Sequence, residues 1–269
     1  MLALIKSKIT NYWNVEYSGN QFLIFRYLIG VVGFIHILDN ILNADTYLNL
    51  VVNLDPAIPW KQISPILPEF LYQHSVYLTI QLALATLFLL LAAGLLNKPA
   101  RIILALLYFL NYNLQLYGGY GAEQYILLAL FYVPFMPLEK TDRDIQSKSI
   151  ATQLFKFHFT LTLLEVSSLK LMQPGWWSGE SLYSALTGPW STTSFFLSNS
   201  FENYSWLFCV MAWGSMLLQF SEAILLNTRF QQQAAIVLML FHLSLVITMG
   251  MPYFAIVIIG TLTLFLVKD

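Results

Sequence analysis

The stretch VYLTIQLALATLFLLLAAGLL, Val76–Leu96, decides the fold class of this chain. It contains no charged side chain, and its length matches the roughly 20 apolar residues that an α-helix needs to cross a bilayer. Similar stretches recur along the chain, and 58% of its 269 residues are hydrophobic while only 10% are charged. A soluble domain carries about 25% charged residues. The composition therefore predicts an integral membrane protein.

The apolar runs are all expected to be helices, because hydrocarbon offers backbone groups no hydrogen-bond partner outside the helix. The runs are Gln21–Ile41, Val76–Leu96, Ile102–Tyr117, Ala122–Pro137, Ala151–Met172, Tyr204–Leu226, Ala234–Thr248 and Pro252–Val267. They predict an all-α, polytopic bundle of about eight transmembrane helices in a single domain over residues 1–269. Residues 102–117 and 122–137 are short runs, and if they form a re-entrant hairpin the number of crossings falls to six.

Lysine and arginine occur in alternate connections between the runs, which predicts the orientation through the positive-inside rule. The connections expected on the cytoplasmic side contain Lys6, Lys8, Lys98, Arg101, Lys140, Arg143, Lys148, Arg229 and Lys268. The other connections contain only Lys61. We therefore expect both termini to be cytoplasmic and the loops 42–75 and 173–203 to face outward.

The two outward loops differ in composition. Residues 42–75 contain four prolines, too many for a continuous helix, and are predicted to form a cap on the membrane surface. In the other loop, Pro174 and Gly175 end the preceding run, and Trp176 and Trp177 suit the aromatic belt of the interface. A short interfacial helix is expected over Ser178–Leu186.

Polar residues within the runs predict a polar cavity that opens outward. Ionisable residues in a membrane span are costly and usually face the bundle interior or a water-filled cavity. Those expected in the outer half are His36, Asp39, Asn111, Asn113, Gln115, Glu123, Gln124, Glu165, Lys170 and His242. Several runs contribute to this set, so its members are expected to converge.

Simpler interpretations apply to several of these residues. Lys170 can extend its amine to the outer headgroups, and Asn111 and Asn113 can bridge neighbouring helices. His36 and His242 can be hydrogen-bonded core residues, since no histidine spacing typical of a metal site occurs. Glu165 is less easily explained in this way.

Glu165 lies too far from the helix end to reach water easily, so its carboxyl group should be paired or protonated. His158, Thr162 and Glu165 have the spacing of one helical face. They are expected to form a polar stripe with partners inside the protein.

Four motifs resemble those of one family. They are FRYLIG (Phe25–Gly30), NYNLQLYGGYGAEQ (Asn111–Gln124), the SLKL sequence from Ser168 with the following Trp-x-x-Gly-x-Ser, and TMGMPYF (Thr248–Phe254). Together they resemble the HTTM family, the membrane domain related to vitamin K-dependent γ-glutamyl carboxylase. The resemblance extends over essentially the whole chain.

The resemblance implies carboxylase-like chemistry that is linked to oxygen or a quinone. Lys170 matches a family lysine that acts as the base toward vitamin K hydroquinone, so the implied cofactor is a vitamin K-type quinol. Apolar surroundings favour the neutral form of an amine, which can then act as a base near pH 7. With Lys170 as base, Glu165 and His36 complete the expected catalytic set, and the expected cofactor-binding residues are Asn113, Glu123, His242 and Trp176.

Two departures favour other hypotheses. The family enzyme has a histidine near the start of the fourth run, where this chain has Glu123, and it continues into a large extramembrane domain. A second hypothesis is therefore a non-enzymatic membrane subunit of a peptide-maturation or export system, working with a separate soluble or membrane protein. A third is a carrier for a small lipid or quinone. The bilayer is the expected partner in every case, and no nucleic acid is expected.

Overall fold

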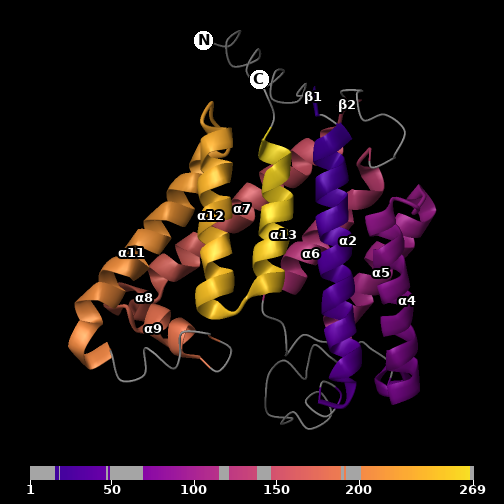
Figure 1. Cartoon of the computed structure of the whole chain (residues 1–269), viewed down its shortest axis with the longest axis horizontal. Helices are drawn as coiled ribbons and strands as arrows, with labels where there is room; N and C mark the ends of the chain where they lie inside the picture. Colours follow the sequence, from indigo (N-terminus) through magenta and orange to yellow (C-terminus); the bar gives the residue numbers. More distant parts are fainter. Residues whose placement is uncertain are drawn as a thin grey trace. The chain divides into compact units, whose positions relative to one another are not determined.

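The computed structural model describes residues 16–17, 19–46, 48, 69–114, 121–137, 147–188, 191 and 201–266. These residues are almost entirely helical (Figure 1). Besides helices and their connections, this part of the chain contains two paired strands of two residues each, β1 (Glu16–Tyr17) and β2 (Ser147–Lys148). The predicted all-α class is confirmed for this part of the chain.

Every predicted apolar run coincides with a helix. The helices are α2 (Gly19–Leu42), α4 (His74–Ala93), α5 (Lys98–Leu114), α6 (Ala122–Tyr132), α7 (Ile150–Met172), α11 (Phe201–Leu225), α12 (Gln231–Met249) and α13 (Pro252–Leu262). Short 3-10 helices also occur: η3 (Glu69–Tyr72) precedes α4, η4 (Val133–Phe135) follows α6, and η5 (Thr263–Phe265) follows α13.

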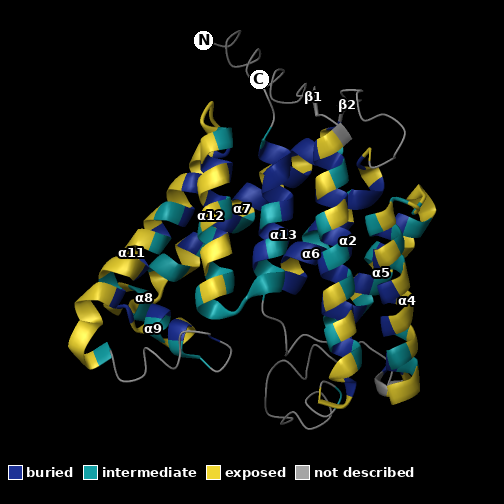
Figure 2. Ribbon diagram, in the orientation of Figure 1, coloured by how far each residue is buried: buried dark blue, intermediate teal, exposed yellow. Residues whose placement is uncertain are grey.

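Within the described residues, 4 helices are long and apolar enough to cross a membrane: Asn20–Leu42, His74–Ala93, Phe201–Leu225 and Gln231–Met249. The segments Ala122–Phe135 and Pro252–Phe265 are apolar but shorter. Exposed residues, many of them large and hydrophobic, line the outer faces of α4, α11 and α12 (Figure 2). These features are those of a membrane protein, whereas the count of about eight crossings and the side of the termini stay predictions.

The chain folds into two compact units. Unit 1 comprises Met1–Tyr17 and Lys148–Asp269, and unit 2 comprises Ser18–Ser147. The single domain that the sequence predicts over residues 1–269 stays a prediction, and each unit is described below by itself.

In unit 2, α2 packs along α4, and α4, α5 and α6 follow as successive neighbours. Gly30 allows α2 and α4 to approach closely, because a Cβ atom there would lie 2.5 Å from the backbone nitrogen of Ala92. Arg101, in the first turn of α5, is buried and donates from Nη1 to the carbonyl oxygens of Val133 (3.3 Å) and Met136 (3.0 Å). The sequence placed Arg101 in a connection between helices, whereas in the structure its side chain binds the backbone of η4, directly after α6.

In unit 1, α7 packs against α11, α11 against α12, and α12 against α13. The short helix expected over Ser178–Leu186 is observed as α9 (Glu180–Thr187), and the tryptophan pair itself lies in a separate helix, α8 (Pro174–Ser178), that the sequence did not predict. Leu182 and Leu186 of α9 are buried in a cluster with Phe208 and Ala212 of α11. This packing fixes α8 and α9 against α11, next to the end of α7.

Some predictions fall outside the described residues. These are the proline-rich cap over most of 42–75, residues 189–190 and 192–200 of the loop 173–203, and Gln115.

Candidate functional site

The predicted site residues belong to both units. Lys170, Glu165, Trp176 and His242 lie in unit 1, and His36, Asn113 and Glu123 lie in unit 2. We describe the surroundings of each group within its own unit.

The Lys170 amine, in the last turn of α7, has two partners in unit 1. Its Nζ donates a hydrogen bond to Gln219 Oε1 of α11 at 2.7 Å. The same atom lies 4.5 Å from the centroid of the Trp176 ring of α8, a distance at which a cation is attracted to an aromatic face. The structure thus brings the predicted residues Lys170 and Trp176 together and adds Gln219. We call Lys170, Trp176 and Gln219 the lysine centre.

His242, on α12, is buried and lies within electrostatic range of Lys170. Its Nδ1 is 2.9 Å from the carbonyl oxygen of Leu238, one turn earlier on the same helix. The imidazole contacts the rings of Phe241 and Phe254, with centroid distances of 5.2 and 5.6 Å. Its Nε2 is buried without a hydrogen-bond partner among the described residues. The core-histidine interpretation therefore accounts for one ring nitrogen but not for the other.

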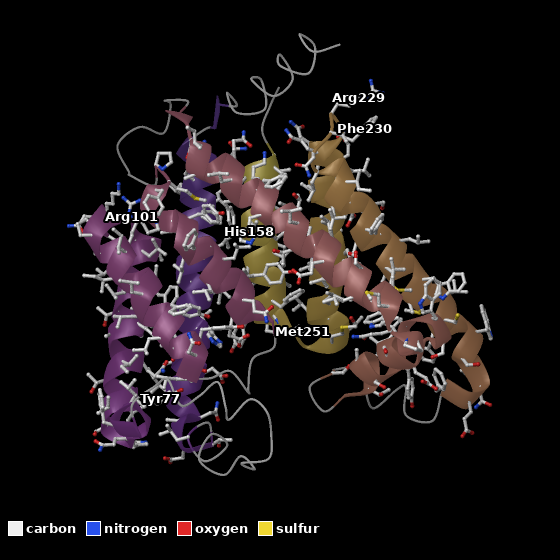
Figure 3. All side chains as sticks on the ribbon, turned by 180° about the vertical axis from the view of Figure 1, so that it is seen from behind. Tyr77, Arg101, His158, Arg229, Phe230 and Met251 are labelled. Atoms are coloured by element: carbon white, nitrogen blue, oxygen red, sulfur yellow. The ribbon has the colours of Figure 1, made fainter. Side chains whose placement is uncertain are left out.

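Glu165 is exposed, and among the described residues it makes no hydrogen bond or ion pair with the lysine centre. His158, at the other end of the predicted stripe, is exposed as well (labelled in Figure 3), and Thr162 donates to the His158 carbonyl oxygen at 3.1 Å. Because both side chains are exposed, this stripe is not part of the buried core, and the expectation that its residues have partners inside the protein stays a prediction. Glu165 as a catalytic residue stays a prediction.

The buried polar face of α7 is a different one. It carries Gln153, Lys156, Thr160 and Ser167, spaced three, four and seven residues apart, and it continues to Lys170. Lys156 is 3% exposed, and its Nζ lies 4.5 Å from the centroid of the Phe265 ring. This face, rather than the stripe containing Glu165, leads along α7 to the lysine centre.

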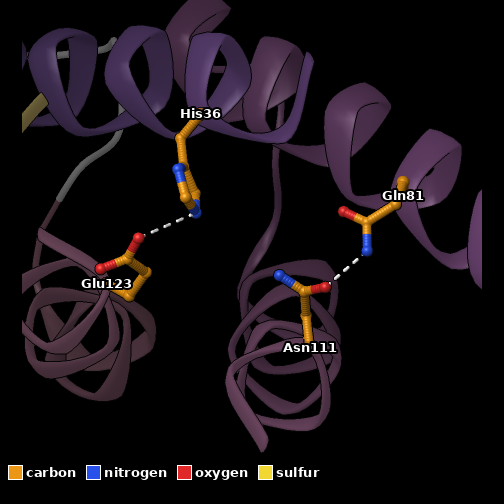
Figure 4. Close-up of polar contacts among 4 residues, drawn as sticks. All are labelled: His36, Gln81, Asn111 and Glu123. Atoms are coloured by element: carbon orange, nitrogen blue, oxygen red, sulfur yellow. Dashed lines mark hydrogen bonds and ion pairs between the residues drawn. The ribbon is translucent and has the colours of Figure 1, made fainter. Parts of the chain in front are cut away.

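In unit 2, His36 of α2 and Glu123 of α6 form a buried pair, with 3.7 Å between Nε2 and Oε1 (Figure 4). A second polar contact joins α4 to α5, where Gln81 Nε2 donates to Asn111 Oδ1 at 2.5 Å. The buried Tyr108 of α5 lies within electrostatic range of Glu123. Polar groups from four helices are thus buried in this unit, and we call them the histidine–glutamate cluster.

Asn113 does not take part in the Gln81–Asn111 bond. Its amide donates to the carbonyl oxygen of Phe109 at 2.7 Å, within its own helix. Asn111 instead has the helix-bridging role that the sequence offered as an alternative for both asparagines. The prediction that Asn113 binds a cofactor stays untested.

Sequence reasoning missed Gln219 and Lys156. Gln219 and Glu222 are buried on α11, and both carboxylate oxygens of Glu222 lack a hydrogen-bond partner among the described residues. A polar residue in the middle of an apolar run was the available signal, because such residues usually face the protein interior. No group of three or more His, Cys, Asp or Glu that could hold a metal ion occurs in the described part of the chain.

Comparisons with known proteins found no matching family model, no matching curated protein and no matching solved structure. The resemblance to the HTTM family accordingly enters below as part of a proposal.

Proposed function

We propose that the chain is an HTTM-like integral membrane protein whose lysine centre takes a proton from a lipid-soluble ligand that carries a hydroxyl group. The observation that supports this function is the meeting of Lys170, Trp176 and Gln219 from three helices at the end of α7. A vitamin K-type quinol is the ligand that the family resemblance implies, with oxygen- or quinone-linked, carboxylase-like chemistry.

The residues around Lys170 fit an aromatic ligand with a hydroxyl group. Trp176 offers a ring face, Phe254 lies beside His242, and the Lys170 amine can bind an oxygen atom. When bound, a quinol supplies an aromatic ring and a weakly acidic hydroxyl group. The donor set matches both features.

Lys170 would act as a base through the lone pair of its neutral amine. Gln219 Oε1 can accept an N–H bond from the amine in either protonation state, so it orients Nζ before and after the transfer. Once Nζ holds the proton, the face of Trp176 stabilises the positive charge. The half-buried position limits competition from water for the same proton.

The proposal includes the orientation of the chain. We propose about eight crossings of a bacterial inner membrane, both termini in the cytoplasm, and a polar cavity that opens outward near Lys170. The alternation of lysine and arginine between connections supports this orientation. The tryptophans of α8 support a position for Lys170 close to the outer interface, where a ligand in the bilayer can reach it.

Substitution of Lys170 tests the base role. Lys170→Arg keeps a positive charge but cannot deprotonate in the working pH range, and Lys170→Met removes the amine. A positioned base contributes about 10²–10⁴-fold to a rate. We therefore expect both variants to lose oxygen uptake driven by a short-chain naphthoquinol, measured in membranes with equal amounts of protein.

Lys98→Arg is the matched control, because Lys98 is an exposed lysine in the first turn of α5. It should retain the wild-type rate. Full activity of Lys170→Arg would contradict the base role.

The alternative function is a non-enzymatic membrane subunit or a small lipid or quinone carrier. The observation that favours it is that Lys170 already has Gln219 and Trp176 as partners, as a fixed structural cation would. Under this alternative Lys170→Arg is tolerated, and a partner protein or a bound lipid co-purifies with the chain. Mass spectrometry of the purified protein identifies either one.

A further inference from the structure

The unused nitrogen of His242 is the observation from which we infer a further role. The side chain is 1% exposed, and among the described residues Nε2 has no hydrogen-bond partner. A buried polar atom without a partner is uncommon in native proteins and costs folding free energy. The atom therefore calls for a partner that is not one of these residues.

The contact at the other nitrogen fixes what kind of partner is required. The Leu238 carbonyl oxygen can only accept a hydrogen bond, so Nδ1 must be the donor in their 2.9 Å contact. In the neutral imidazole Nε2 then carries the lone pair and is an acceptor. A positive charge on this buried ring would be costly among the apolar side chains around it, which supports the neutral form. Nε2 consequently needs a hydrogen-bond donor.

The surroundings of His242 connect this acceptor to the lysine centre. The imidazole lies within electrostatic range of Lys170, and the rings of Phe241 and Phe254 hold it on two sides. Both residues belong to unit 1. A donor group on a ligand of the lysine centre can thus meet an acceptor whose orientation the Leu238 bond has fixed.

We propose that His242 Nε2 accepts a hydrogen bond from the ligand and so determines its specificity: the site takes a ligand with a free hydroxyl group and rejects the corresponding ether. The proposal rests on the proposed function, since it assumes a ligand at the lysine centre. A site built to accept from a hydroxyl group loses affinity for an analogue without one, because its buried acceptor stays unpaired. His242 is in this sense a specificity-determining residue, and Lys170 keeps its role as base, because a ligand with two hydroxyl groups, as a quinol has, can donate a hydrogen bond to His242 from one and give a proton to Lys170 from the other.

Binding of 1-naphthol and 1-methoxynaphthalene tests this role without turnover. The two compounds share the ring system, and only the first has a donor. We expect calorimetric titration of the purified, full-length protein in detergent to give a Kd for the naphthol that is lower by roughly tenfold or more, the ratio that one unpaired buried acceptor produces. In His242→Phe the ratio of the two Kd values should fall close to one. The phenyl ring of this variant suits the aromatic neighbours Phe241 and Phe254.

Two further variants separate the possible outcomes. His158→Phe is the matched control, because His158 is an exposed histidine of unit 1, and it should keep the wild-type ratio. Lys170→Met should weaken both compounds and retain a preference for the naphthol. Equal binding of the two compounds by the wild type, or an unchanged ratio in His242→Phe, would overturn the role of His242 and leave the lysine centre as a ligand site. Binding of neither compound would instead count against the proposed function on which the role rests.

Discussion

At Gly94 a single backbone position ends one helix of unit 2 and accommodates a buried charge. Its φ of 72° lies in the left-handed region, and its N–H bonds to the Leu91 carbonyl oxygen at 2.9 Å. The guanidinium group of Arg26 occupies the space where a Cβ atom would project. A cation at the carboxyl end of α4 is favourably placed in the field of the helix dipole. Glycine at this position therefore serves both the turn and the arginine.

Gly94→Ala should destabilise the protein. A left-handed conformation costs a residue with a Cβ atom roughly 1–2 kcal/mol, and displacement of Arg26 adds to that cost. We expect a lower midpoint of thermal unfolding in detergent. Gly214→Ala is the control, because Gly214 lies within α11 with no atom within 4 Å of the added carbon. It should be neutral or more stable by about 0.5–1 kcal/mol, and equal midpoints for the two variants would contradict the role of Gly94.

At the same scale, the sequence indicated Lys170 and Trp176 but not Gln219. A lysine at the end of an apolar run followed by tryptophans is an anomaly that a reader of the sequence can notice. The Lys170–Gln219 bond joins residues 49 positions apart, so it depends on how α7 packs against α11. Hydropathy predicts both helices but not which of their residues face each other. The hydrogen bond between Lys170 and Gln219 could for this reason not be predicted from the sequence.

At the scale of the element, helix α7 carries two polar stripes on opposite faces. Both have helical spacing, so periodicity alone cannot tell which one is buried. The exposed stripe contains His158 and Glu165, and the buried one contains Gln153 and Ser167. Packing against α11 and η5 decides between the two faces. The sequence singled out the face that the structure leaves exposed.

Cysteine scanning of α7 tests the assignment of the two faces. Cys209 is the single cysteine of the chain and is first replaced by serine. In this Cys209→Ser background, His158→Cys and Glu165→Cys should react fully with a maleimide in detergent, because the native side chains are exposed. Gln153→Cys and Ser167→Cys should stay largely unlabelled, because the native residues are 1% and 0% exposed. Labelling is read as the mass added to the intact protein. The opposite pattern would restore the stripe predicted from the sequence.

Helix boundaries were predictable where hydropathy changes and less so where polar residues begin a helix. The third run was expected to start at Ile102, whereas α5 starts at Lys98. Asn97 Oδ1 accepts a hydrogen bond from the Ala100 amide at 3.0 Å, which is the contact of a helix-capping residue. The polar first turn lies outside the apolar run. The sequence Asn-Lys-Pro was the available signal, because proline is common in the first turn of a helix.

At the scale of the whole molecule, the division into two units has no counterpart in the hydropathy pattern. The chain passes from one unit to the other at Tyr17–Ser18 and again at Ser147–Lys148, and the second point lies within a polar connection that resembles the others in composition. Periodicity identifies helices one at a time, and the neighbours that each helix selects depend on side-chain shape. The sequence placed the expected site residues in one cavity only because they lie at a similar depth in the membrane. In the structure these residues belong to two units, and each has its neighbours within its own unit.

Orientation is a property of the whole chain, and it can be tested from one side of the membrane. The test uses the Cys209→Ser background and an impermeant thiol reagent added to intact cells. Three variants, Gln173→Cys, Asn53→Cys and Ser194→Cys, should react, because these positions lie in the loops expected to face outward. Positions 53 and 194 are outside the described residues. Thr228→Cys, in the exposed turn between α11 and α12, and Ser147→Cys should react only after the membrane is opened. Lysine and arginine retained on the cytoplasmic side produce this pattern. Labelling of Thr228→Cys and Ser147→Cys from outside, with Gln173→Cys protected, would invert the chain and place Lys170 toward the cytoplasm, where the proposed outward route for its ligand no longer exists.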